Sequence, residues 1–127
     1  METQFGKKKL LVVDDDPLML RTIRGWLSGD YDVSVVTSGQ TALAFLKKFT
    51  PDLLLLDYEM PVMSGPQLLE KLRADVSLAK IPVFFLTGKD DAEGLARINS
   101  LNPQGCILKN RTPDEVKKSI ASFFQNR

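Results

Sequence analysis

The chain of 127 residues contains no histidine and only one cysteine, Cys106. Without histidine, a serine hydrolase triad, a histidine general base and a histidine-ligated zinc or iron site are all excluded. A single cysteine cannot form an internal disulfide or a cysteine-rich metal cluster, which fits a reducing compartment and makes the cytoplasm the expected location. Any metal that the chain binds must therefore be held by oxygen ligands.

A surplus of charge of one sign is also missing, because 17 basic side chains face 16 acidic ones and leave a net charge of +1. No overall field favours nucleic acid or anionic lipid, so we expect neither direct nucleic-acid binding nor membrane insertion. The apolar run Leu10–Val13 near the amino terminus is far shorter than the core of a signal peptide or a membrane helix. We expect one domain over residues 1–127, with its core over residues 8–125.

What the sequence does contain is a run of four leucines, Leu53–Leu56, that leads directly into Asp57. An apolar run without polar alternation predicts a strand that is buried on both faces, as in the middle of a parallel sheet. Met60-Pro61 and Ser64-Gly65-Pro66 are turn signals, so Asp57 is predicted to end the strand and to lie where ligands bind in open α/β sheets. A lone aspartate at such a position is more often only a turn former.

Four more short apolar runs alternate with segments of helical spacing. The other strands are predicted at Lys8–Val13, Tyr31–Val36, Val83–Leu86 and Cys106–Leu108, and the apolar faces of the helices at residues 17–27, 42–49, 68–76, 91–101 and 116–124. Asp16-Pro17 predicts a helix start, and Thr112 with Glu115 has the form of a capping box. Strict βα alternation predicts an α/β fold: a doubly wound, five-stranded parallel sheet with helices on both faces.

Polar residues follow four of these strands where the strands end: Asp14, Asp15, Asp57, Thr87 and Lys109. Each has an ordinary structural explanation, as a helix cap, a turn residue or a surface lysine. Together they suggest a site, because the carboxyl ends of parallel strands lie on one edge. Clustered carboxylates repel one another unless a cation neutralises them, and Mg²⁺ (or Mn²⁺) prefers such hard oxygen ligands. A carboxylate there can act as a nucleophile toward phosphorus, with a hydroxyl and a cation holding the transferred oxygens.

With these residues, the chain resembles the receiver domains of two-component response regulators, of the chemotaxis-regulator type, and the resemblance implies a flavodoxin-like fold. The matching segments, in the family's order and spacing, are Leu11–Asp15, Leu54–Asp57 with Met60-Pro61 and Gly65, Leu86–Gly88 and Leu108-Lys109. The resemblance implies that Asp57 is the phosphoacceptor and that Thr87 and Lys109 bind the phosphoryl group. It also implies that Asp14, Asp15 and Asp57, with the backbone carbonyl of Glu59, hold magnesium.

The same resemblance implies the partners. The phosphodonor would be a histidine on a sensor histidine kinase or a phosphotransfer protein, in agreement with the absence of histidine from this chain. A downstream protein or output domain would bind the face made by the fourth helix, the fifth strand and the fifth helix. The chain would then be a signalling domain that catalyses only its own phosphorylation and slow dephosphorylation.

The sequence departs from the family's pattern at four positions. Asn110 follows the lysine where a proline is usual, Cys106 stands where an aromatic switch residue is usual, and Val62 and Ser64 replace the common glycine and aspartate. We expect Cys106 to be a small buried residue in a central strand, too small for the aromatic's switching movement. We therefore expect the loop 87–91 and the start of the next helix to carry the change of state.

One modulating pair is also predicted at the mouth of the site. Glu59 lies two residues after Asp57, and Lys89 lies two residues after Thr87. Paired across the mouth, these charges would hinder the water that hydrolyses the acyl phosphate, although an exposed pair contributes only about 0–1 kcal/mol.

Three alternative interpretations stay open from the sequence alone. The first is a phosphatase of the haloacid dehalogenase type with Asp14 as its nucleophile, which would leave Asp57 without a role. The second is a pseudo-receiver that acts only as an interaction module. The third concerns extent, since the chain is also compatible with being one domain of a longer regulator.

Overall fold

The computed structural model describes residues 7–88 and 92–126, which form five strands and five helices in alternation. The strands are β1 (Lys9–Val13), β2 (Asp32–Val36), β3 (Leu53–Asp57), β4 (Val83–Thr87) and β5 (Gly105–Leu108). The helices are α2 (Pro17–Leu27), α3 (Gly39–Leu46), α4 (Gly65–Ala74), α5 (Ala92–Ser100) and α6 (Pro113–Gln125). None of the helices among these residues is long and apolar enough to cross a membrane.

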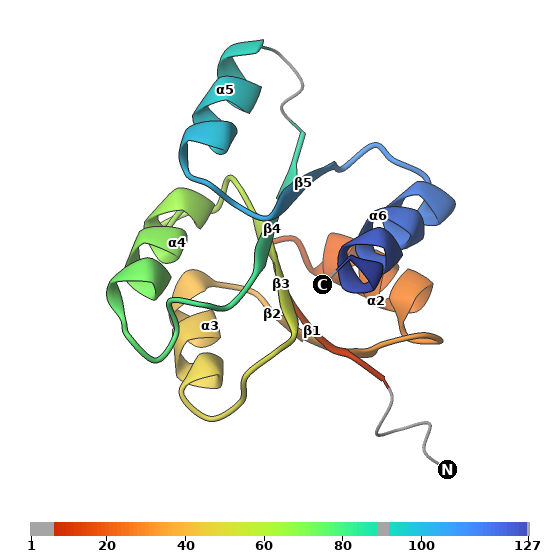
Figure 1. The fold of residues 1–127 in the computed structure, drawn as a ribbon, viewed down its shortest axis with the longest axis horizontal. Coiled ribbons are helices and arrows are strands. Elements are labelled where there is room, and N and C mark those ends of the chain that lie inside the picture. Colours follow the sequence, from red (N-terminus) through yellow and green to blue (C-terminus); the bar gives the residue numbers. More distant parts are fainter. Residues whose placement is uncertain (1–6, 89–91, 127) are drawn as a thin grey trace.

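All five strands are parallel and form one sheet in the order β2-β1-β3-β4-β5 (Figure 1). The order reverses direction at β1, so the neighbours β1 and β3 flank the switch point where open α/β sheets bind ligands. The four leucines of β3 and its final residue, Asp57, are all buried, as the unbroken apolar run predicted. The doubly wound parallel fold is therefore confirmed.

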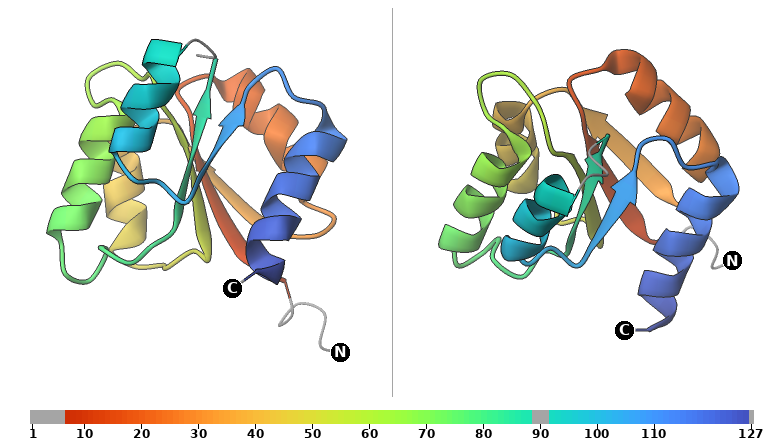
Figure 2. Two further views of the ribbon diagram at one scale, coloured as in Figure 1. Left: turned by 45° about the horizontal axis from the view of Figure 1, so that its top comes forward. Right: turned by 90° about the horizontal axis from the view of Figure 1, so that it is seen from above.

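Helices cover both faces of the sheet and create two separate cores. Figures 1 and 2 show α3, α4 and α5 on one face and α2 and α6 on the other. Alternate side chains of the central strands enter each core, so that Leu54 and Leu56 pack on the three-helix side and Leu53 and Leu55 on the two-helix side. The whole sheet is thus shielded, and polar chemistry is confined to its edges.

Side-chain caps begin four of the five helices. Asp16 accepts from the Leu18 amide and Ser38 from the Thr41 amide. Ser64 and Thr112 each form a complete capping box, with Gln67 and Glu115 respectively. The Asp16 cap and the box at Thr112 were predicted from the sequence, and the box at Ser64 was missed because a serine-glycine-proline run was interpreted only as a turn.

The structure corrects three of the sequence-based expectations. Phe49 and Val76 were assigned to the apolar faces of helices, but α3 and α4 end before them and their side chains are 59% and 96% exposed. Cys106 was expected in a central strand and buried, but β5 is an edge strand of the sheet and the cysteine side chain is exposed. In each case an apolar residue at a suitable spacing predicted a buried side chain. The side chain is exposed because the helix ends before the residue or because its strand lies at the edge of the sheet.

Gly65 allows α4 to begin unusually close to the end of β3. Its amide donates to the Tyr58 carbonyl at 3.0 Å. A Cβ atom on Gly65 would lie far inside van der Waals contact with the carbonyl oxygen of Asp57, and 3.0 Å from the Tyr58 Cα. These neighbours are backbone atoms that cannot move aside, so glycine is required here by space.

We therefore expect Gly65→Ala to lower the free energy of unfolding by roughly 1–3 kcal/mol through overpacking. Gly25→Ala is the matched control, because nothing lies within 4 Å of a Cβ atom added in the middle of α2. Alanine there should raise stability by about 0.5–1 kcal/mol through helix propensity alone. Urea denaturation of both variants checks this, and equal effects of the two substitutions would refute the close approach.

Candidate functional site

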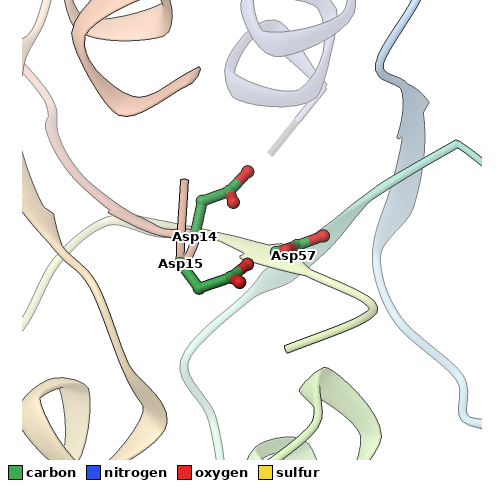
Figure 3. A group of neighbouring side chains, drawn as sticks. All are labelled: Asp14, Asp15 and Asp57. Carbon is green, nitrogen blue, oxygen red and sulfur yellow. The ribbon is translucent and has the colours of Figure 1, made fainter. Parts of the chain in front are cut away.

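Three carboxylates gather at the carboxyl ends of β1 and β3 (Figure 3). Asp14 and Asp15 follow β1 directly, and Asp57 is the last residue of β3. One oxygen from each lies within 4.8 Å of the others. Asp14 and Asp57 are buried and Asp15 is exposed, so the cluster has a closed side within the sheet and an open side toward solvent. The sequence predicted this grouping, and the structure brings the three residues together.

Lys109 reaches the cluster from the end of β5. Its ammonium lies 2.9 Å from Asp57 Oδ1 and 3.2 Å from Asp14 Oδ2. The Lys109 amide donates to the Thr87 carbonyl at 2.8 Å, which fixes the backbone from which the side chain extends. The lysine thus reaches both buried carboxylates although Asn110 follows it in place of the family's usual proline.

Thr87 ends β4, between Asp57 and Lys109 in the sheet. It is paired in register with Leu108, while Asp57 is paired with Leu86. Its side chain is 1% exposed, so the hydroxyl is held at the buried side of the same edge. Four neighbouring strand ends therefore supply the five residues that the sequence singled out.

Burial of Asp57 raises the pKa of its carboxyl from 3.8 to about 7. The hydrogen bond from Lys109 opposes this rise, whereas the charge of Asp14 adds to it. For Lys109, burial alone would lower the pKa, but its hydrogen bond to Asp57 and the charges of Asp57 and Asp14 together raise it. The lysine stays positively charged, and without a further cation the aspartates are only partly compensated.

The carboxylates fit a hard divalent cation. Asp14 Oδ1 accepts from the Asp16 amide at 3.0 Å, but the buried Asp14 Oδ2 accepts no hydrogen bond and, among the described residues, is compensated by its ion pair with the Lys109 ammonium at 3.2 Å. A buried carboxylate oxygen without a hydrogen bond costs free energy unless a cation compensates it, and Lys109 is shared with Asp57. Asp14, Asp15 and Asp57 therefore suit Mg²⁺, which binds oxygen and keeps water on its open side.

The remaining predicted residues lie around this centre. Glu59 is exposed in the loop after β3, two residues beyond Asp57. Lys89, its proposed partner, and the rest of the segment 89–91 lie outside the described residues, so the pairing stays a prediction. Cys106 is exposed, yet desolvation raises the pKa of its thiol, which disfavours a reactive thiolate.

The loop from Tyr58 to Ser64 contains a contact that sequence reasoning missed. Met63 lies against Gly39, the first residue of α3, so closely that a Cβ atom on the glycine would be 2.6 Å from Met63 Sδ. No role was predicted for Gly39 from the sequence. The available sequence signal for this contact was the glycine itself, because a residue without a side chain lets another segment come close to the backbone.

Comparisons with known proteins agree with this geometry. Residues 10–121 match the family described as response regulator receiver domain. The chemotaxis protein CheY-3 of Vibrio cholerae is 32% identical, over 98% of this chain and 98% of its own length. The sensor histidine kinase TmoS of Ectopseudomonas mendocina is 35% identical over 95% of this chain, which spans only 12% of that kinase.

Solved structures give the same result. The chemotaxis protein CheY4 of Vibrio cholerae superposes with a TM-score of 0.83 at 25% identity, over 91% of this chain and 98% of that one. The signal receiver domain of a histidine kinase from Syntrophus aciditrophicus gives a TM-score of 0.84 at 26% identity, over 94% and 91% of the two chains. With its five-stranded fold and its cluster of strand-end residues, the chain belongs to the response regulator receiver domain family of two-component signal transduction.

Proposed function

We propose that Asp57 of this chain accepts a phosphoryl group from a phosphohistidine on a sensor histidine kinase or phosphotransfer protein. The observation that carries the proposal is the pairing of Lys109 with Asp57 at 2.9 Å, beside two further aspartates at the carboxyl edge of the sheet. In this arrangement a nucleophile, its charge-compensating cation and candidate metal ligands occupy one edge.

In the proposed transfer, an Asp57 carboxylate oxygen attacks phosphorus while the phosphorus–nitrogen bond of the donor breaks. The imidazole of the partner leaves with the bonding electron pair and takes up a proton, and an acyl phosphate remains on Asp57. Lys109 moves from neutralising the carboxylate to holding a phosphoryl oxygen, and the hydroxyl of Thr87 donates to another. These steps need no base from this chain, which agrees with the absence of histidine.

Asp14, Asp15 and Asp57, with the backbone carbonyl of Glu59, would hold Mg²⁺. When bound, the ion supplies positive charge that lowers the repulsion between the carboxylates and the phosphoryl oxygens. Asp14 contributes the buried oxygen that accepts no hydrogen bond, and Asp15 contributes from the exposed side. The two acids following β1 therefore have different tasks in the proposal, one inside the sheet edge and one at its surface.

The remaining parts of the proposal concern the role of the whole protein. The chain acts as a single receiver domain in the cytoplasm that switches protein contacts, rather than as an enzyme with a free substrate. A partner or output domain would bind over α5, β5 and α6. The family match argues against the dehalogenase-type phosphatase, and the assembled site argues against the pseudo-receiver.

Acetyl phosphate should label wild-type protein only when Mg²⁺ or Mn²⁺ is present, and Asp57→Asn should not be labelled. Intact-mass spectrometry detects the added phosphoryl group, and peptide mapping after borohydride reduction locates it. Asp114→Asn, at an exposed position in the first turn of α6, is the matched control and should be labelled like the wild type. Equal labelling of the Asp57 and Asp114 variants would refute Asp57 as acceptor, and labelling at Asp14 would favour the phosphatase.

Asp57 should also make stability depend on pH when no divalent cation is present. Its pKa is about 7 in the folded protein against 3.8 ordinarily, so folding takes up a proton between these values. The stabilisation from this proton is complete below pH 4 and is lost as the pH rises through 7.

We therefore expect the free energy of unfolding of the wild type to fall by on the order of 2 kcal/mol, relative to that of Asp57→Asn, as the pH rises from 5.5 to 8. Urea denaturation in EDTA measures the difference, with Asp30→Asn, in the exposed turn after α2, as the control that follows wild type. A difference between wild type and Asp57→Asn that does not change with pH would show that Asp57 is ionised throughout.

A further inference from the structure

We infer that Met63 and Gly39 act together as positioning residues for the cation site, by locking the loop after Asp57 against the start of α3. The inference rests on the proposed function, since it concerns the same site. The lock is defined by the contact of these two residues. It joins the backbone that follows β3 to the segment that follows β2, which the sequence separates by more than twenty residues.

The nearest neighbours of Gly39 in the direction of its missing side chain belong to Met63. The three atoms nearest to a Cβ placed on Gly39 are Met63 Sδ, Cγ and Cβ, at 2.6, 3.1 and 3.2 Å. Gly39 is buried, and Met63 is partly buried against the core beneath α3, α4 and α5. Any side chain at position 39 would therefore displace the methionine from its place.

Both ends of the loop are fixed independently of Met63. At the first end, the backbone amide of Tyr58 donates to the Leu86 carbonyl at 2.9 Å, and the backbone carbonyl of Tyr58 accepts from the Gly65 amide at 3.0 Å. At the other end, the Ser64 amide donates to the Gln67 side chain at 2.9 Å in the capping box. Between these points lies the segment 59–62, whose Glu59 carbonyl is a proposed metal ligand. Met60 within the segment and Met63 directly after it both pack against the core, and Met63 also contacts Gly39.

The backbone beside Met63 is strained, which indicates that the contact holds the loop in place. Val62 has φ 69°, and Met63 donates to the Pro61 carbonyl at 2.8 Å across it. A β-branched residue is disfavoured in this left-handed region, and Val62 gains nothing by packing because it is 90% exposed. Such a conformation persists only where neighbouring contacts impose it, and the seated side chain of Met63 is such a contact.

The other half of the lock is tied to Asp14, a proposed metal ligand that follows β1 directly. The Asp14 amide donates to the Val36 carbonyl at 3.2 Å, at the end of β2. Three residues later Gly39 begins α3, whose cap is Ser38. A continuous series of contacts therefore leads from Asp14 through the end of β2 and the start of α3 to the loop after Asp57. Because the contact of Met63 with Gly39 is its last member, it sets where the Glu59 carbonyl lies relative to the aspartates.

A double-mutant cycle with Gly39→Ala and Met63→Ala tests the lock. Binding of Mn²⁺, followed by electron paramagnetic resonance, reports cation affinity without any phosphoryl transfer. We expect each single variant to weaken Mn²⁺ affinity at least three-fold and the double variant to bind no more weakly than Met63→Ala. Labelling by acetyl phosphate at saturating Mg²⁺ should stay near the wild-type rate in all of them, because the lock affects ion binding and not the acceptor.

Two further variants separate positioning from simple packing. Met63→Leu keeps the volume and should keep the affinity, whereas Val62→Gly should raise the melting temperature by removing the strain. Single variants that have a lower melting temperature but bind Mn²⁺ like wild type would overturn the inference. The inference would also fail if Gly39→Ala weakened Mn²⁺ binding equally in the wild-type and the Met63→Ala protein. Failure of the proposed function itself would be recognised separately, in wild-type protein that is not labelled at Asp57.

Discussion

Asp14 and Asp57 are carboxylates that the sheet buries side by side, and Lys109 is the described cation that contacts both. Much of the structure at this edge can be understood from the need to compensate these charges. The lysine must come from a third strand, β5, and its backbone must be fixed, which the bond to the Thr87 carbonyl achieves. The buried oxygen of Asp14 without a hydrogen bond marks where compensation is incomplete and where a cation fits.

The apolar framework and the polar edge support each other. Two helix layers bury the central strands on both faces, so their backbones have little freedom to move. The loop after β3 at the carboxyl edge is held by three local interactions. These are the close approach of Gly65 to the end of β3, the capping box at Ser64 and the contact of Met63 with Gly39. This arrangement places Asp57, the proposed acceptor, at the end of a rigid buried strand, while the loops around it rest on a small number of contacts.

The edge strand β5 differs from what the residue type of Cys106 predicted. Cys106 is exposed there rather than buried, and it is smaller than the aromatic residue that is usual at this position. The neighbouring Gly105 leaves room for the ring of Phe84, whose atoms would lie 2.7–2.9 Å from an added Cβ atom. Phe84 in turn meets Phe123 of α6 edge to face at 5.3 Å. Both rings lie on the face covered by α2 and α6, whereas Cys106, paired in register with Phe85, belongs to the opposite face, so this aromatic pair does not fill the place of the usual ring.

The sequence by itself determined the element order, the parallel sheet and the five residues of the site. Buried strands produce unbroken apolar runs such as Leu53–Leu56, and the polar residue that ends each run must lie at the common edge. Tertiary structure alone decided the exposure of Cys106 and Phe49, because exposure depends on strand order and helix length. It also decided the contact of Met63 with Gly39 and the left-handed turn at Val62, since a contact between distant segments leaves no periodic signal in either one.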